Sequence, residues 1–392
     1  MPIQTAPVLR PFLSSVPETA GVAARAIERT RWPVSILGVP LDPVTSDEAL
    51  ARIAEMVASG RPHYVVTPNV DFLVQARHDE ELRQILCEAD LALCDGQPLV
   101  WASRWLGNPL PERVAGADLA PRLLEQAARL GHRVFLLGAT PESNEEARLR
   151  LQQRLPDLQL AGQYAPPFRP LAEMDNDEII CRVRAAEPDI VLVSFGCPKQ
   201  EKWIARHYRA LDVPVCLGVG ATIDFLAGRV SRAPVWMRRS GLEWTYRLGL
   251  EPRRLFRRYA TDARYFGTAV LGQWLSAPRR AFTNGTLEMI SATPPCHHLR
   301  ATGALCRPVL DGAAEISRRI MEADCDCQLD LAAVNFIDST GVGAFTAWHR
   351  QLRRTGHRLV LGRPSDTVRR MLRQMRQTHF ATTDSAPQGA AA

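Results

Sequence analysis

The chain has 392 residues, a net charge of +6 and an ordinary hydrophobic fraction of 46%. This length exceeds that of one typical domain, so we expect two domains with irregular ends. The nine cysteines are odd in number and form no CxxC pair, which favours free thiols in a reducing compartment over a disulfide framework. No apolar run approaches the ~18 residues of a membrane-spanning helix, and the N-terminus lacks the apolar core of a signal peptide.

Residues 1–33 mix Pro, Ser and Ala and are expected to be disordered. From there to residue 235, apolar strand-like runs alternate with segments of helical periodicity. This alternation predicts a Rossmann-like α/β core over residues 34–235, with a mostly parallel sheet covered by helices on both faces. The predicted strands are 35–41, 63–67, 91–94, 133–137, 158–164, 190–195 and 215–219. The predicted helices are 46–59, 70–89, 97–106, 116–130, 142–155, 175–186 and 198–211.

Residues 236–282 form an appendage rich in arginine and aromatic side chains, which we expect to be helical. Between residues 229 and 280 there are twelve arginines against three acidic residues. Two interpretations remain open. The segment is either a solvated basic helix pair packed by its aromatics, or an amphipathic surface whose rings and arginines meet the headgroups of a membrane. No nucleic-acid recognition motif accompanies the charge, so nucleic acid is not an expected partner.

A second, smaller unit is expected towards the C-terminus. Residues 283–298 carry Thr, Asn, Gly, Ser and a Pro pair, which predicts a linker. Residues 299–380 are expected to form a small α/β domain around a strand at 328–337 and a helix at 342–354. The Ala-rich tail, 381–392, is expected to be unstructured.

Polar side chains follow two of the predicted strands, where an open α/β sheet binds its ligands. Asp95 fits either an N-cap of the next helix or a general base that takes a proton from a hydroxyl. Thr67 and Asn69 fit helix caps as well as a pocket wall. Arg113 fits a solvated surface charge as well as a clamp on phosphate oxygens. We expect these residues to share one crevice.

Later strand ends carry further candidates. Gly138 lies in a strand-to-helix turn that lacks the GxGxxG fingerprint, which argues against a dinucleotide cofactor and a nicotinamide-dependent oxidoreductase. Gln200 begins a helix whose start fits a purely structural role or a phosphate site. Lys199 and Lys202 are the only lysines, which suggests a need for an ammonium group there, with chance as the alternative. Asp224 follows a glycine-containing turn.

Five blocks of sequence together resemble the WecG/TagA/CpsF family of bacterial glycosyltransferases over about residues 34–275. They read TPN at 67–69, DG at 95–96, WASRWLGNPLPERV at 101–114, FGCPKQE at 195–201 and GVGATIDFLAG at 218–228. The resemblance implies a GT-E type fold and an inverting transfer of N-acetylmannosamine or a related hexose. The donor would be a UDP-sugar and the acceptor a polyprenyl-pyrophosphate-linked sugar, in the synthesis of bacterial polysaccharide or cell-wall glycan.

The family pattern also implies roles for individual residues. Asp95 would be the base, with Thr67 and Asn69 beside it. The implied substrate-binding residues are Arg113, Lys199, Gln200, Gly138 and Asp224, with Arg113 and Gln200 at the diphosphate or the sugars and Asp224 near the nucleoside.

The appendage of relatives is thought to dock on the membrane and close the active site. Arg247, Arg254 and Arg257 match arginines there and could hold the lipid pyrophosphate. The resemblance therefore implies a protein of the cytoplasm that is peripheral on the inner face of the cell membrane.

Two DxD triplets could in principle hold a metal ion. The first, 175–177, opens a predicted helix and fits a capping acid, and the second, 324–326, lies in the other domain. We therefore expect no metal and no cofactor.

The strand at 329–337 and the following DSTGVG at 338–343 resemble a STAS domain, the fold of anti-sigma factor antagonists. In relatives one of the two hydroxyl residues is phosphorylated, so Ser339 and Thr340 are phosphorylation candidates; a helix cap is the alternative role. The domain implies a regulatory role and a possible protein partner. It also leaves open a second function, a non-catalytic signalling protein that senses a nucleotide sugar and acts through its STAS domain.

Overall fold

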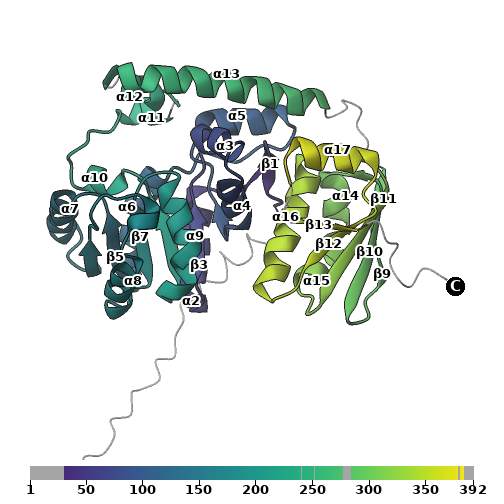
Figure 1. Cartoon of the computed structure of the whole chain (residues 1–392), viewed down its shortest axis with the longest axis horizontal. Helices are drawn as coiled ribbons and strands as arrows, with labels where there is room; N and C mark the ends of the chain where they lie inside the picture. The colour runs from purple at the N-terminus through teal and green to yellow at the C-terminus, as the bar shows by residue number, and fades with distance from the viewer. Residues whose placement is uncertain (1–30, 240, 251, 277–283, 378–379, 384–392) are drawn as a thin grey trace, which may run out of the picture. The chain divides into compact units, whose positions relative to one another are not determined.

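The fold is that of a computed structural model, which describes residues 31–239, 241–250, 252–276, 284–377 and 380–383. Its larger sheet has six parallel strands in the order β4-β3-β8-β7-β5-β6 (Figure 1). These strands are β3 His63–Val66, β4 Leu91–Ala92, β5 Arg133–Gly138, β6 Gln159–Tyr164, β7 Ile190–Ser194 and β8 Val215–Gly218.

Helices cover both faces of this sheet and form two separate cores. One face is covered by α3 Val70–Ala76, α4 Glu80–Glu88, α5 Gln97–Trp105, α8 Asn176–Ala185 and α9 Lys199–Leu211. The other is covered by α2 Ser46–Ser59, α6 Gly116–Leu130, α7 Pro141–Arg154 and α10 Thr222–Leu226. A short 3-10 helix, η1, spans Leu171–Glu173. The predicted α/β class and the two-sided covering of the sheet are confirmed.

Side-chain alternation along the strands explains why two cores form. In β5, Val134 and Leu136 belong to one core, while Phe135 and Leu137 belong to the other, and all four are buried. Successive side chains of a strand point to opposite faces, so a strand buried on both faces must be apolar throughout. This is the continuous apolar pattern from which the parallel sheet was predicted.

Two predicted elements near the start of the core differ from the structure. The expected strand at 35–41 is an antiparallel hairpin, β1 Val34–Ile36 and β2 Val39–Leu41, separate from the large sheet. It turns at Leu37 and Gly38, which both have positive φ. The expected helix at 70–89 is two helices, because the Asp79 side chain accepts a hydrogen bond from the backbone N–H of Leu82 and starts α4 anew.

The appendage is helical, as predicted. It consists of α11 Val235–Arg239, α12 Glu243–Leu250 and the long α13 Pro252–Ser276. Phe266 and Val270 of α13 are buried in the same core as α3 and α5. One turn later, near the C-terminal end of the helix, the side-chain amide of Gln273 bridges the hairpin, accepting from Leu37 N and donating to Ser35 O. The C-terminal half of the helix is therefore packed on the α/β core.

The C-terminal domain has a five-stranded sheet in the order β13-β12-β11-β10-β9, with only β9 antiparallel. Its strands are β9 Gly285–Ser291, β10 Cys296–Leu305, β11 Asp326–Ile337, β12 Leu359–Gly362 and β13 Ala381–Thr383. Its helices are α14 Arg307–Gly312, α15 Ala314–Met321, α16 Ser339–Arg354 and α17 Asp366–Gln374.

The predicted boundaries of this domain are wrong at both ends. The expected linker at 283–298 contains β9 and the start of β10, and the expected tail begins with β13. β9 is an edge strand with only Leu287 fully buried, so it lacks the apolar pattern by which a strand is found in sequence. Residues 384–392 of the expected tail lie outside the described residues.

Trp32 corrects the other predicted terminus. It was assigned to the disordered N-terminus, most of which lies outside the described residues, yet its side chain is 1% exposed. The ring lies in the core of the C-terminal domain, edge-on to Trp348 with 5.7 Å between ring centroids. A single buried tryptophan without neighbours of helical or strand periodicity gives no sequence signal.

Replacing Trp32 by alanine would leave a void in this core. We expect Trp32→Ala to lower the free energy of unfolding by about 3–5 kcal/mol, visible as a lower thermal midpoint in calorimetry. Trp105→Ala is the matched control, because that ring is 70% exposed on α5. Equal shifts for the two variants would contradict the burial of Trp32.

Candidate active site

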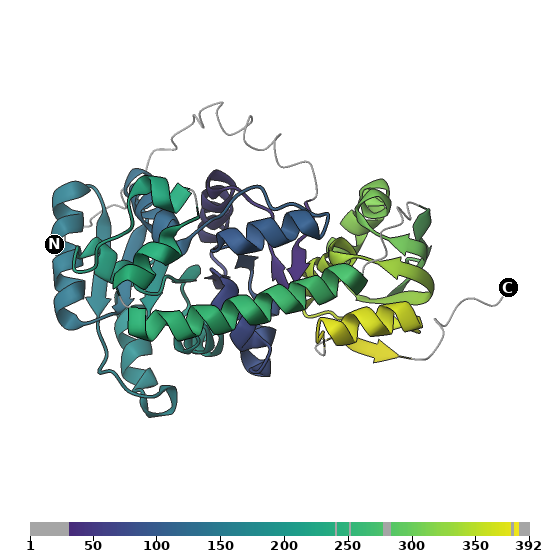
Figure 2. The same ribbon diagram turned by 90° about the horizontal axis from the view of Figure 1, so that it is seen from above.

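A cavity of about 530 Å³ lies beyond the carboxyl ends of β3 and β4, between α5 and the appendage. Helices α5 and α13 run beside each other in both views (Figures 1 and 2), and residues of both helices line the cavity. One end of the cavity is polar and is formed by Asn69, Asp95 and Arg113. The rest of the wall is mostly apolar, with Trp101 from α5 and Phe266 from α13, and it also carries the charged side chains of Asp71, Arg258 and Asp262. The cavity therefore offers a charged end and a long apolar surface to one ligand.

Asp95 lies at the polar end, three residues beyond β4. Its backbone N–H donates to the carbonyl of Pro68 at 2.9 Å, so the segments leaving β3 and β4 stay paired beyond the strands. Its side chain is 26% exposed. The N-cap residue of α5 is Gly96, so the capping interpretation of Asp95 does not hold. The role of general base stays a prediction.

Asn69 and Thr67 differ in position. Asn69 caps α3 by accepting from the N–H of Phe72 at 3.3 Å, and it also lines the cavity, so both of its predicted roles are compatible with the fold. Thr67 is 6% exposed and donates to the carbonyl of Gly218 at 3.4 Å. Among the described residues it does not belong to the cavity wall; it ties β3 to β8 behind that wall.

Arg113 is the centre of an ion-pair cluster. Its Nη1 lies 3.7 Å from Asp95 Oδ1 and 3.3 Å from Glu243 Oε2, and its Nη2 lies 2.6 Å from Asp118 Oδ2. The side chain is 16% exposed, so it is not a solvated surface charge. One guanidinium thus joins the loop after β4 to α6 and to α12 of the appendage.

Two further arginines complete this cluster. Arg232 and Arg238 each place Nη1 2.7 Å from Asp118 Oδ1. Burial alone would raise the pKa of Asp118, but the hydrogen bond and charge of Arg232, together with Arg113 and Arg238, hold that pKa below its ordinary value. Asp118, Glu243, Arg232 and Arg238 were not predicted from the sequence, because most ion pairs of this cluster join residues more than a hundred positions apart and so leave no local pattern.

The other predicted substrate-binding residues gather at the ends of β5, β7 and β8. Gln200 is 2% exposed, and its Oε1 accepts from the N–H groups of Gly196 and Gly220 at 3.2 and 3.1 Å. It therefore fixes two loops. Asp224 Oδ1 accepts from the hydroxyl of Ser143 at 2.7 Å and so links α10 to α7. Lys199 Nζ donates to the carbonyl of Arg169 at 2.6 Å.

Gly138 ends β5 in a backbone conformation with φ +102°, which favours glycine. A Cβ there would lie 2.5 Å from the carbonyl oxygen of Ser194, so the residue also allows β5 and β7 to approach closely. Among the described residues, this second group does not line the cavity of Asp95. The two groups adjoin through Gly218, whose carbonyl accepts from Thr67 and whose Cα faces Gln200.

The predicted arginines of the appendage are only partly visible. Arg247 lies on α12 and Arg254 on α13, but their side chains fall outside the described atoms. Arg257 is exposed on α13. Its neighbour Arg258 lines the cavity, with its guanidinium carbon 5.4 Å from the ring centroid of Tyr259. The role of Arg257 stays a prediction, and Arg258 is an additional candidate.

The predicted phosphorylation candidates begin α16 and are buried, Ser339 at 5% and Thr340 at 1% exposure. The cap of this helix is Asp338, whose carboxylate accepts from the N–H groups of Thr340 and Gly341, both at 2.9 Å. The alternative role of the two hydroxyls as caps is therefore wrong.

Comparison with known proteins now decides the family. A sequence model described as the glycosyl transferase WecG/TagA/CpsF family matches residues 34–280, more than half of the chain. The chain belongs to this family. A second model, described as a Mlab, STAS domain, matches residues 288–381. The predicted fusion of a WecG/TagA/CpsF transferase to a STAS domain is confirmed.

Relatives cover the transferase part of the chain. Proteins named N-acetylglucosaminyldiphosphoundecaprenol N-acetyl-beta-D-mannosaminyltransferase, from Staphylococcus aureus strains MRSA252 and NCTC 8325, are each 31% identical over 226 residues. The matches span 57% of this chain and 87% of each relative. The solved structure of the anti-sigma factor antagonist SpoIIAA in its unphosphorylated form covers 26% of this chain and 89% of its own, with 24% identity and a TM-score of 0.23.

Two searches of the described residues bear on membranes and metals. None of the described helices combines the length and apolar character that crossing a bilayer would require. The described part of this WecG/TagA/CpsF transferase contains no group of three or more His, Cys, Asp or Glu side chains arranged to hold a metal ion. The absence of a metal requirement remains a prediction from sequence.

Asp262 of α13 adds a second carboxylate to the cavity. Burial, with the charge of Asp71 added to it, raises the pKa of Asp262 to about 6, and Arg258 only partly offsets this. Below that pH the group is a neutral acid that can donate a hydrogen bond to an anionic oxygen.

The raised pKa predicts a defined pH dependence of stability. The folded pKa of Asp262 lies above its ordinary value of 3.8, so its protonation stabilises the fold at low pH, and this contribution is lost as the pH rises from about 4 through 6. We expect Asp262→Asn to have a higher thermal midpoint than the parent chain. The difference should be smallest at pH 4 and should increase up to pH 7. A difference independent of pH would contradict the assignment; Asp47→Asn, with 82% of that side chain exposed, is the control.

Proposed function

We propose that this chain is an inverting glycosyltransferase that moves N-acetylmannosamine or a related hexose from a UDP-sugar to a polyprenyl-pyrophosphate-linked sugar. The named activity of the staphylococcal relatives supports the sugar and the lipid-linked acceptor. The family pattern supports the UDP-linked donor and a role in the synthesis of polysaccharide or cell-wall glycan.

The observation that carries the proposal is the pairing of Asp95 and Arg113 in a cavity whose wall is mostly apolar, although Arg258 and Asp262 of α13 also line it. A polyprenyl-pyrophosphate acceptor has the same division, with an anionic, sugar-bearing head and an apolar chain. The wall formed by Trp101, Trp244 and Phe266 suits the first isoprene units. The charged end suits the two diphosphates and the reacting sugars.

The reaction that fits this site is a single displacement. Asp95 takes the proton of the acceptor hydroxyl as its oxygen attacks the anomeric carbon of the donor. The bond from that carbon to the UDP oxygen breaks, and UDP leaves with the bonding electrons and an added negative charge. A guanidinium in the position of Arg113 stabilises this charge by paired hydrogen bonds to phosphate oxygens. Attack from the face opposite the leaving group inverts the anomeric centre.

The carboxylates now bound to Arg113 fit this interpretation. Three arginines, Arg113, Arg232 and Arg238, face Asp95, Asp118 and Glu243, so the cluster is neutral without substrate. A diphosphate that enters beside Arg113 competes with Glu243 for the same Nη1. If Glu243 is displaced, the three arginines face only two carboxylates, and the net positive charge attracts the anion. The donor would thereby change the contact that holds α12 of the appendage.

Exposed apolar side chains on α5 and α13 support peripheral membrane binding. Trp105 is 70% exposed, Leu271 52% and Leu275 67%. Such residues beside an arginine-rich helix fit the headgroup region of an anionic bilayer, where the lipid-linked acceptor resides.

The base assignment is tested by Asp95→Asn, which keeps the shape and removes the basic oxygen. Using UDP-N-acetylmannosamine and a synthetic lipid-pyrophosphate N-acetylglucosamine, we expect kcat for UDP release to fall by at least about 100-fold, since a positioned base contributes about 10²–10⁴. The KM for the donor should change little. The exposed Asp47→Asn is the control, and retained turnover by Asp95→Asn would refute the assignment.

The membrane assignment is tested by vesicle flotation. We expect the double substitution Leu271→Ser and Leu275→Ser to reduce binding to phosphatidylglycerol-containing liposomes at least about fivefold, because the buried apolar area at the interface is lost. Leu149→Ser is the matched control, since this leucine is 43% exposed on α7. Unchanged binding by the double variant would contradict docking through α13.

A further inference from the structure

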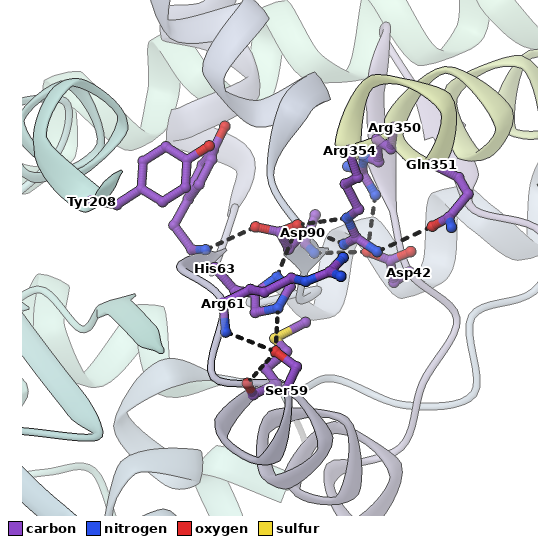
Figure 3. Close-up of polar contacts among 12 residues, drawn as sticks. Asp42, Ser59, Arg61, His63, Asp90, Tyr208, Arg350, Gln351 and Arg354 are labelled. Carbon is purple, nitrogen blue, oxygen red and sulfur yellow. Dashed lines mark hydrogen bonds and ion pairs between the residues drawn. The ribbon is translucent and has the colours of Figure 1, made fainter. Parts of the chain in front are cut away.

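Helix α16 of the STAS domain lies against the transferase through a buried arginine. Arg350 Nη1 lies 3.3 Å from Asp42 Oδ2, and each side chain is 7% exposed (Figure 3). Its Nε and Nη2 donate to the carbonyls of Cys87 and Leu86 at 2.7 and 3.2 Å. These carbonyls end α4, where the helix dipole favours a positive charge. Each of the three nitrogens of this guanidinium therefore has a partner in the transferase.

Asp42 connects Arg350 to β4, the strand that precedes the proposed base. The carboxylate oxygen that faces Arg350 also accepts from the N–H of Ala92 at 2.7 Å, and the backbone N–H of Asp42 donates to the carbonyl of Ala92 at 2.8 Å. Ala92 ends β4, and Asp95 follows three residues later. Arg350 and Asp95 are therefore joined through one carboxylate and one short strand.

Two neighbouring arginines of α16 strengthen this side of the contact. Arg354 Nη2 lies 2.6 Å from Asp90 Oδ1, and Arg353 pairs with Glu88 (Figure 3 shows the first pair). Asp90 also accepts from the N–H of Tyr64 at 2.9 Å, the second residue of β3. The positions 350, 353 and 354 form one face of a helix. Of their carboxylate partners, Asp42 pairs with β4, Asp90 directly precedes it and Glu88 ends α4.

The other end of α16 is closed by the segment before β1. A Cβ on Gly343 would lie 1.8 Å from the carbonyl oxygen of Pro33, so backbone packs on backbone there. Trp32 continues this contact into the STAS core. Ser339 and Thr340, in the first turn of the same helix, are buried. A separate protein or a kinase cannot reach these hydroxyls in this conformation.

We propose that the partner of this STAS domain is the transferase of the same chain, and that Arg350 is a positioning residue that holds β4 and therefore Asp95. The STAS domain then acts as a permanent structural part of the enzyme, and its α16 face is not available to an external partner. The catalytic consequence rests on the proposed function, whereas the docking itself does not.

The docking is tested by hydrogen exchange of the full chain, measured by mass spectrometry. In the parent chain we expect peptides covering 339–354 and 86–95 to be strongly protected. In Arg350→Gln we expect exchange of 86–95 to rise at least about tenfold, with 133–164 unchanged. Arg319→Gln, an exposed arginine on α15 of the same domain, is the control and should match the parent. Fast exchange of the start of α16 in the parent, or no change at 86–95 in Arg350→Gln, would overturn the proposal.

Activity separates positioning from a purely structural role. We expect Arg350→Gln and Asp42→Asn to lower kcat at least about fivefold with the donor KM within about twofold, because Arg113 is untouched. Asp42→Asn keeps an acceptor for the N–H of Ala92, so it tests the charge pair even if Arg350→Gln fails to fold. Arg350→Lys, which keeps the charge, should recover part of kcat.

The outcomes remain distinguishable from those of the proposed function. If the exchange pattern is as expected but the parent chain transfers no sugar to any acceptor tested, the docking stands and the proposed function fails. If the parent is active and both Arg350→Gln and Asp42→Asn retain its kcat, the positioning role is refuted.

Discussion

The guanidinium of Arg113 joins three parts of the chain at one edge of the cavity. It contacts Asp95 after β4, Asp118 on α6 and Glu243 on α12. Because it is largely buried, it needs anionic partners, and the chain supplies them from three elements. The same requirement supports the proposal that Arg113 binds the diphosphate of the donor. The ion pair between Arg113 and Glu243 joins the appendage to the core. An anionic substrate that binds Arg113 would replace Glu243 in this pair.

Much of the core could be predicted from sequence because its strands are buried on both faces. Continuous apolar runs such as 190–195 and the polar residues after them, Asn69 and Asp95, indicated the sheet and the edge at which the cavity lies. Asn69, Asp95 and Arg113 indeed share one cavity wall. Thr67 and Gln200 do not line this cavity but form hydrogen bonds to neighbouring backbone segments. A local sequence pattern does not distinguish such a structural role from contact with a ligand.

What sequence could not predict depends on partners distant in the chain. Glu243 and Asp118 are ordinary acidic residues until the fold places them beside Arg113. The edge strand β9 was taken for a linker because most of it faces solvent. Trp32 was taken for part of a disordered terminus because its burial comes from a domain that begins some 250 residues later. Each error arose where the deciding contact is long-range.

The signature turn of the STAS domain is packed against another part of the chain. The sequence DSTGVG at 338–343 suggests a phosphorylated surface, yet in this chain the same turn packs against the residues before β1. The arginines of α16 meet carboxylates next to β3 and β4, so both ends of the helix are engaged with the transferase. These contacts support the proposal that the STAS domain is a fixed support for β4, the strand that precedes Asp95.

The central claim is that sugar transfer takes place where Asp95 meets Arg113. A structure of the chain with a UDP-sugar and a short-chain lipid-pyrophosphate acceptor tests it most directly. We expect the donor diphosphate to lie on Arg113 and the acceptor hydroxyl to lie within about 3 Å of the Asp95 carboxylate, the distance that proton transfer requires. A donor bound away from Arg113, with no sugar hydroxyl near Asp95, would contradict it.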